Sequence, residues 1–295
     1  MKAQTGSYRV VDLPPDRRGL PTMLDVYWWK HSVYGLLEVD VTVPHGFMAD
    51  YKACTGESPS FTGYLAFCLA QAIDEDKSVQ ALPKGRRHLV VFDDVDVNLL
   101  IEHETGGTRV PMVHIIRRAN HKTFLEIHRE IRSIQAAPVP SDKGLAPWCR
   151  FFLRLPWPLS RMFSALMLAA TRREPTLMAA MGGTVGVSAV GMFGRGIAGW
   201  GLTPLPHSLD LVVGTITRKP AIVAGQIEAR DILNLTVVVD HDITDGAPAT
   251  RFVRRLVELI ESGHGLAQTD MTVDGLFSQQ ASRLAPVVSV AASHV

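Results

Sequence analysis

The sequence predicts an α+β domain with a mixed β-sheet. Of its 295 residues, 46% are hydrophobic, which is enough for a sizeable packed core. Segments with the alternation of half-buried strands occur beside segments with the apolar spacing of helices. These segments do not follow the strict strand–helix order of a doubly wound parallel sheet, and no internal repeat is visible. An α+β arrangement therefore fits better than a parallel α/β fold.

The first half of the chain begins with a polar, proline-rich arm over residues 1–20. Residues 36–43, LLEVDVTV, partly alternate apolar and polar side chains and predict a half-buried strand. Residues 60–76 repeat apolar positions at helical spacing, and Ser60 is suited to cap that helix at its N-terminus. Two β-rich runs follow, 88–103 and 108–116, separated by the turn signal TGG.

The second half continues with an amphipathic helix over 121–135 and buried strands over 209–217 and 233–240. A last helix follows, because apolar residues recur on one face. They are Phe252, Val253, Leu256, Leu259 and Ile260. We expect a single domain over residues 1–264 and a loosely ordered tail over 265–295.

Composition and charge narrow the classes of function. A formal net charge of +1 argues against nucleic-acid binding, which needs a concentrated basic surface. Three cysteines, Cys54, Cys68 and Cys149, form neither a CxxC pair nor an even disulfide framework, which favours a reducing cytoplasm. No signal peptide is visible at the start, and no apolar run reaches the roughly 18 residues of a membrane span. We expect a cytoplasmic protein without a bound metal.

An HxxxDG motif begins where the last predicted strand ends. Its members are His241, Asp245 and Gly246. A neutral imidazole held at a strand end can accept a proton from a thiol or hydroxyl, because its ordinary pKa of about 6.5 is near working pH. Asp245 is either a second catalytic carboxylate or, as we favour, a brace that holds the loop through a salt bridge. Gly246 is expected to let the backbone turn.

A glycine-rich segment, GGTVGVSAVGMFG over residues 182–194, contains the second candidate site. Glycines weaken a strand unless something must approach its backbone closely. The lysine and serine of a phosphate-binding P-loop are missing. Ser188 places a hydroxyl in the middle of this strand, and on the local pattern alone it is an ordinary strand serine or a functional donor.

Taken together, the two segments resemble the catalytic domain of the 2-oxoacid dehydrogenase acyltransferases, the dihydrolipoyl acyltransferase family. The blocks GGTVGVSAVGMFG and VDHDITDGA stand in the order and near the spacing of the family's GGT…S…FG and DHRxxDGA blocks. Upstream, LLEVDVTV and the arm's DLPPDRR are similar to further family segments. The resemblance covers most of the chain.

The resemblance implies a chloramphenicol-acetyltransferase-like two-layer fold and a homotrimer, or a higher multiple of three, with active sites between subunits. It implies that His241 is the general base and Asp245 its motif partner. Ser188 of the neighbouring subunit would donate a hydrogen bond to the oxyanion of the tetrahedral intermediate. Arg17 lies near the arginine of the family's N-terminal arm and is the expected partner of the motif aspartate.

The implied activity is that of a CoA-linked acyltransferase, which moves an acyl group between a CoA thioester and a thiol or other acceptor. Coenzyme A or acyl-CoA is then a substrate. No covalent lipoate is expected, because neither a lipoyl domain nor a subunit-binding domain is seen upstream of Leu13. Asp242 stands where the family usually has an arginine, which is expected to alter loop packing or the preferred substrate charge.

The largest departure from the family is a block over residues 136–181, in which aromatic side chains alternate with arginines. Such a block can form a helix at a membrane surface. It can equally pack against another subunit or cover an acyl pocket, which we favour. Two other functions stay open: a catalytically silent scaffold with the same trimeric fold, and a membrane-surface binding module that uses this block.

Overall fold

The computed structural model describes residues 30–105, 108–137, 157–189 and 197–267, with a few isolated positions nearer the N-terminus. Its centre is a six-stranded sheet in the order β1-β8-β7-β6-β4-β5. Strand β6 is parallel to both of its neighbours, and the other pairs are antiparallel. The strands are β1 Ser32–Asp40, β4 Val97–Thr105, β5 Thr108–Ile116, β6 Val185–Ala189, β7 Leu209–Val223 and β8 Gln226–Asp240. This mixed sheet confirms the predicted α+β class.

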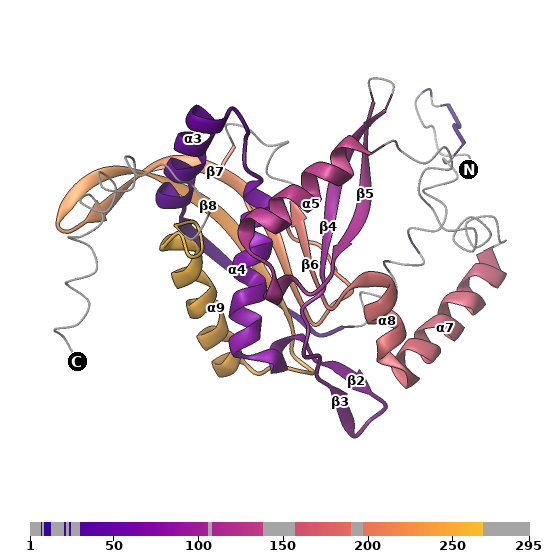
Figure 1. Cartoon of the computed structure of the whole chain (residues 1–295). Helices are drawn as coiled ribbons and strands as arrows, with labels where there is room; N and C mark the ends of the chain where they lie inside the picture. Colours follow the sequence, from indigo (N-terminus) through magenta and orange to yellow (C-terminus); the bar gives the residue numbers. More distant parts are fainter. Residues whose placement is uncertain are drawn as a thin grey trace.

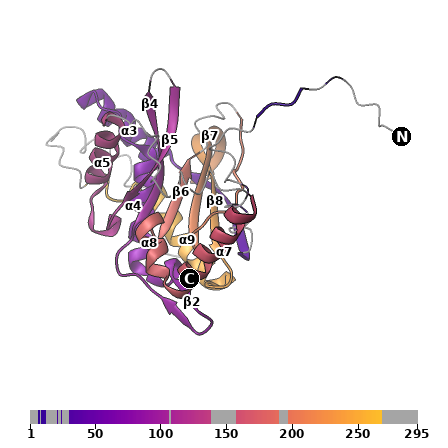
Figure 2. The ribbon, with the colours of Figure 1, turned by 90° about the vertical axis from the view of Figure 1, so that its right-hand side faces the viewer.

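Four helices form a second layer against one face of the sheet (Figures 1 and 2). They are α3 Thr42–Thr55, α4 Phe61–Glu75, α5 Phe124–Ala136 and α9 Gly246–Glu261. The apolar side chains of alternate strand residues meet these helices in one buried cluster. We call the opposite side of the sheet the outer face. Ser188, Val212 and Thr236 point to it, because their strand neighbours point into the core.

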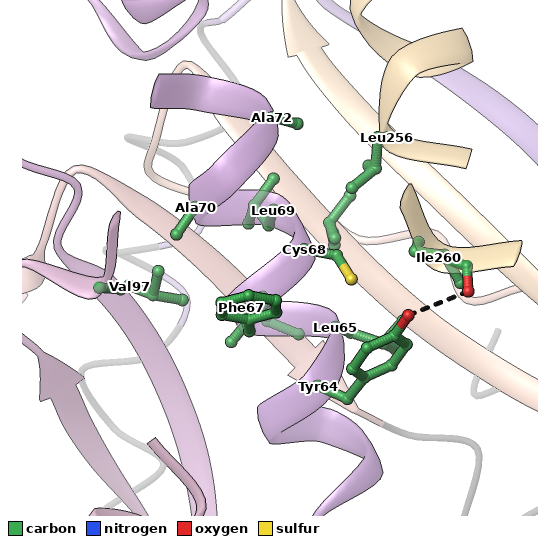
Figure 3. Packing of buried hydrophobic residues seen from close by; sticks show 14 of the residues in the cluster. Tyr64, Leu65, Phe67, Cys68, Leu69, Ala70, Ala72, Val97, Leu256 and Ile260 are labelled. Atoms are coloured by element: carbon green, nitrogen blue, oxygen red, sulfur yellow. Dashed lines mark hydrogen bonds between the residues drawn. The ribbon is translucent and has the colours of Figure 1, made fainter. Parts of the chain in front are cut away.

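Helix α4 lies at the centre of the helical layer. As predicted, Ser60 caps it, and its Oγ accepts a hydrogen bond from the Gly63 backbone at 3.1 Å. The hydroxyl of the buried Tyr64 donates to the carbonyls of Leu259 and Ile260, each at 3.1 Å, near the end of α9 (Figure 3). These contacts supply acceptors for a buried phenol, at carbonyls that also accept backbone hydrogen bonds from His264 and Gly263.

Two boundaries differ from the sequence predictions for local reasons. Helix α5 begins at Phe124, three residues later than predicted, because Thr123 and Glu126 form a capping box. The predicted strand 36–43 was wrong at its end: β1 stops at Asp40, whose Oδ1 accepts hydrogen bonds from Thr42 N–H at 2.9 Å and from its hydroxyl at 2.5 Å. That local pairing ends the strand and starts α3, which the pattern did not predict.

Strands β7 and β8 form a long hairpin that extends beyond the helices (Figure 1). Its inner half is buried, as predicted, whereas its outer half is exposed and was not predicted. A two-residue turn closes it, with φ of 49° at Ala224 and 81° at Gly225. Positive φ at both positions is typical of the tight hairpin turns that suit twisted strands.

The 136–181 block is described from residue 157 onward. It forms helices α7 Trp157–Arg173 and α8 Pro175–Gly182, beside the small hairpin of β2 Leu82–Lys84 and β3 His88–Val90 (Figure 1). The Arg117 guanidinium pairs with Asp96 at 2.7 Å and donates to the carbonyls of Ala179 and Ala180, which fixes the end of α8. On α7, the side chains of Leu159, Met162 and Leu166 are exposed.

The role of that block stays a prediction, as do the domain limits. The arm with Arg17, residues 138–156 of the block and the tail beyond residue 267 lie outside the described residues. Among the helices that the structure does describe, none is long and apolar enough to span a membrane. The same described residues contain no group of three metal-ligating side chains.

Candidate active site

His241 is the first residue after β8, a strand that pairs with β1 on one side and β7 on the other. Its side chain is exposed, and its backbone N–H donates to the carbonyl of His31 at 3.0 Å. The strand end therefore presents the imidazole to solvent at one end of the sheet.

The chain from Asp240 to Asp245, which we call the histidine turn, is closed by local bonds. The Asp240 carbonyl accepts hydrogen bonds from the N–H groups of Ile243 and Thr244, at 3.0 and 3.1 Å. The Asp240 carboxylate accepts one from the N–H of Asp242 at 3.1 Å. The turn leads directly into α9, so a strand and a helix fix both of its ends.

Two residues before β1 also contact the histidine turn. The Lys30 ammonium lies 3.7 Å from the Asp240 carboxylate and donates to the Pro206 carbonyl at 2.5 Å. Burial lowers the pKa of Lys30, although the nearby carboxylates of Asp240 and Asp210 act in the opposite direction. The His31 ring lies 2.9 Å from the Asp242 carboxylate, and this hydrogen bond and charge raise the pKa of His31.

Asp245 is the N-cap residue of α9, is exposed, and makes no side-chain hydrogen bond to the helix start. Its expected partner, Arg17, lies outside the described residues, so the bracing role stays a prediction. The expectation for Gly246 was wrong in its physical reason. Gly246 begins α9 without a left-handed φ, and an added Cβ would meet no atom within 4 Å, so the turn does not require glycine there.

Ser188 lies on β6 near the middle of the sheet, half-buried, with its side chain on the outer face. Two positions earlier, a Cβ on Gly186 would lie 2.4 Å from Asp210 Oδ1 and 3.0 Å from His207 Nδ1. His207 and Asp210 are both buried and bond to each other at 2.6 Å. Gly186 therefore serves the close approach that its strand pattern indicated.

Strand register separates Ser188 from His241 within one chain. Ser188 pairs with Val212 on β7, which pairs with Thr236 on β8, so Ser188 lies two strands away at the level of Thr236. His241 follows Thr236 by five residues. With about 4.8 Å between strands and about 3.3 Å per residue, the two positions are roughly 19 Å apart. By this estimate, one chain does not bring the two side chains together in a single site.

Among the described residues, the outer face is covered at its centre, where Val212 and Thr236 are buried, and exposed at its edges. The segment from residue 197 crosses it, and Trp200 Nε1 donates to the Leu37 carbonyl at 2.9 Å. At the level of Ser188, the edges of the sheet remain apolar and open: Leu36 is 49% exposed, Leu100 45% and Val113 60%. Within the described residues, the buried hydroxyl of Thr236 in the same row has no hydrogen-bond partner. We call these residues, with Val212 and Ser188, the outer row.

The polar residues that hold the site gave little sequence signal. Lys30 and His31 contact residues more than 170 positions away, so no local pattern links them to the motif. The His207–Asp210 pair is local, but its burial between strands and loop could not be read from spacing.

Comparison of the sequence with known proteins identifies similar chains. Residues 156–267 match the family model of the 2-oxoacid dehydrogenases acyltransferase catalytic domain. A lipoamide acyltransferase component of the branched-chain alpha-keto acid dehydrogenase complex of Bacillus subtilis is 24% identical over 234 residues, covering 77% of this chain and 46% of that protein. The chain thus spans less than half the length of this relative.

Solved structures share the fold. A probable dihydrolipoamide acetyltransferase from Listeria monocytogenes superposes with a TM-score of 0.63 at 19% identity, covering 90% of this chain and 97% of that one. The cubic core of a pyruvate dehydrogenase multienzyme complex gives 0.62 at 17% identity, covering 90% and 96%. These likenesses show that the chain has the same two-layer fold as these acetyltransferase structures.

Proposed function

We propose that this chain is a CoA-linked acyltransferase of the 2-oxoacid dehydrogenase acyltransferase family, whose catalytic-domain model matches residues 156–267. It would move an acyl group between a CoA thioester and a second thiol. The observation that carries the proposal is the exposed His241 at the end of β8, in an HxxxDG turn joined directly to α9. A scaffold needs no such base.

In the proposed reaction, the acceptor sulfur attacks the carbonyl carbon of the acyl-CoA thioester. A free thiol is mostly protonated at neutral pH, so a ring nitrogen of His241 takes its proton as the carbon–sulfur bond forms. The tetrahedral intermediate then expels the CoA sulfur, which recovers the proton from the imidazolium. Coenzyme A is thus a product or substrate, and no acyl-enzyme forms.

Ser188 is proposed to donate its hydroxyl hydrogen to the negative oxygen of that intermediate. One such donor is typically worth about 10²–10³ in rate. A half-buried hydroxyl on a strand in the middle of the sheet is well fixed for this role. Asp245 is proposed to brace the histidine turn through Arg17 rather than to touch the substrate.

We propose that each active site takes His241 from one subunit and Ser188 from its neighbour. The separation of roughly 19 Å within one chain, estimated from strand geometry, supports this arrangement. The open apolar edges of the outer row support a subunit interface on the face that displays Ser188. A closed ring of three identical subunits uses one such contact three times. The related pyruvate dehydrogenase core is itself an assembly, a cubic core.

The test is a thiol-release assay over a panel of acyl-CoA donors, with dihydrolipoamide, an amine and an alcohol as acceptors. Wild-type protein should release CoA with the thiol acceptor, and His241→Ala should not. His88→Ala is the matched control, because His88 is also exposed but lies on the separate β2–β3 hairpin. No release above the uncatalysed rate from correctly assembled protein would favour the scaffold.

A further inference from the structure

The histidine turn carries an ion pair that no sequence pattern indicated. We propose that His31 and Asp242 act as positioning residues, which hold the turn so that the His241 imidazole keeps one orientation. The inference rests on the proposed function of His241 as the base. It assigns a role to Asp242, which stands where the family usually has an arginine.

His31 contacts two consecutive residues of the turn. Its backbone carbonyl accepts the His241 N–H at 3.0 Å, and its ring bonds to the Asp242 carboxylate at 2.9 Å. Together these contacts attach the backbone of His241 and the side chain after it to the same residue. Rotation of the turn away from β1 breaks both contacts.

Lys30 contacts the first residue of the histidine turn, Asp240. Its side chain is only 23% exposed and lies 3.7 Å from the carboxylate of Asp240, which is itself 6% exposed. The same ammonium donates to the Pro206 carbonyl, so it ties the histidine turn to the loop before β7. The dipeptide Lys30-His31 therefore holds the three consecutive residues Asp240, His241 and Asp242.

The local charges explain why an acidic residue suits position 242 in this chain. The charged or titratable groups around His31 are Lys30, Asp240 and Asp242, with Asp210 also acting on Lys30. An arginine at 242 would put a second cation beside His31 and near Lys30. The carboxylate instead balances them, and its hydrogen bond and charge raise the pKa of His31.

The sign of the pH effect follows from that raised pKa. The His31–Asp242 pair is fully charged below the ordinary histidine pKa of about 6.5 and is lost as pH rises through the higher value in the folded protein. The base His241 works in its neutral form. The pair therefore holds His241 less firmly at alkaline pH, and the activity of the wild-type protein should decline there. In Asp242→Asn, which lacks the charged pair, this alkaline decline should be absent.

The experiment compares Asp242→Asn, His31→Gln and the double variant in the full-length protein. Each single change should lower kcat about two- to fivefold with KM nearly unchanged, because the pair is exposed and such pairs contribute modestly. The double variant should be no worse than either single variant. Losses that multiply in the double variant would overturn the pairing, as would a loss confined to KM.

His45→Gln is the matched control. His45 forms a similar pair with Asp231, at 3.2 Å, but Asp231 lies in the interior of β8, well before the end of the strand that carries His241. It should leave kcat unchanged. An equal loss in this control would mean that the effect is general destabilisation of the strand, and would overturn a positioning role for His31.

Nuclear magnetic resonance separates this inference from the proposed function. In Asp242→Asn, the measured pKa of the His31 ring should fall toward about 6.5, and exchange of the His241 amide hydrogen should accelerate. These readouts need no turnover. If the wild-type protein shows no acyl transfer but Asp242→Asn shows both changes, the proposed function is refuted and the positioning role of His31 and Asp242 is retained. If the His31 titration and the His241 amide exchange are unchanged in Asp242→Asn, the positioning role is overturned, whatever the activity.

Discussion

The two candidate halves of the site differ in how the fold holds them. His241 lies in an exposed turn, held by polar contacts with Lys30, His31 and the residues around it. Ser188 lies on β6, between β4 and β7, above a close approach of Gly186 to the buried Asp210. The first half is solvent-exposed and held by polar contacts, whereas the second is part of the sheet itself.

This difference indicates in which region a substitution should affect activity without affecting stability. A change in the histidine turn removes few buried contacts, so it should alter catalysis with little effect on unfolding. A change on β6 acts where side chains are packed at interior density, so stability responds as well. The base and the oxyanion donor both need a fixed geometry, and the fold supplies it through different contacts in the two halves.

The largest expected effect is on the histidine turn. His241→Ala should lower kcat at least about a hundredfold, because the thiol loses its proton acceptor. The melting temperature should stay unchanged, since the side chain is exposed. Steady-state kinetics and thermal unfolding on the same preparation check both. Near-wild-type turnover would remove His241 from the mechanism.

Ser188→Ala tests the other half. Loss of one oxyanion donor should lower kcat by about 10²–10³, with KM for acyl-CoA nearly constant. Because Ser188 is half-buried beside packed strands, a small change in melting temperature is expected as well. A loss seen only in KM would indicate that Ser188 binds substrate without stabilising the intermediate.

Two glycines give a matched test of packing. Gly186→Ala should destabilise the protein by about 1–3 kcal/mol, because its Cβ overlaps Asp210 and no open space is available. Gly246→Ala should be neutral or stabilise by about 0.4–1 kcal/mol, since its Cβ meets nothing and its φ is ordinary. Denaturant unfolding measures both. Equal destabilisation would contradict the contrast between the two regions.

A small loss of stability is expected at Asp245. Asp245→Ala should lower stability by about 0.3–1 kcal/mol, because a carboxylate at the start of α9 interacts favourably with the helix dipole. Activity should fall less than in His241→Ala, and Arg17→Ala should give a similar loss. Loss of activity as severe as in His241→Ala, with stability unchanged, would favour direct chemistry over bracing.

Much of the fold was predictable where the signal was local. The strand before His241, the helix after Asp245 and the cap at Ser60 each follow from residues close in sequence. The outer half of the β7–β8 hairpin was not predicted because its residues are exposed or only half-buried and lack a buried run. Helix α3 escaped because the pairing of Asp40 with Thr42 interrupts an otherwise strand-like pattern.

For the candidate site, the sequence indicated which residues to consider but not their geometry. The motif indicated His241, and the resemblance indicated Ser188, but only strand register shows their separation within one chain. The contacts of Lys30 and His31 join distant segments, so they appear only after folding. The expected partner Arg17 and much of the 136–181 block lie outside the described residues.

Subunit mixing tests the shared site most directly. His241→Ala and Ser188→Ala proteins, each nearly inactive alone, are combined in equal amounts and allowed to exchange subunits, with tags that isolate mixed oligomers. After random exchange, about one quarter of all interfaces in the mixture pair an intact His241 with an intact neighbouring Ser188, and an isolated mixed trimer has one such interface of its three. The shared site therefore predicts recovery of about a quarter of wild-type activity in the mixture and about a third in isolated mixed trimers. An active monomer, or no recovery in proven mixed oligomers, would contradict it.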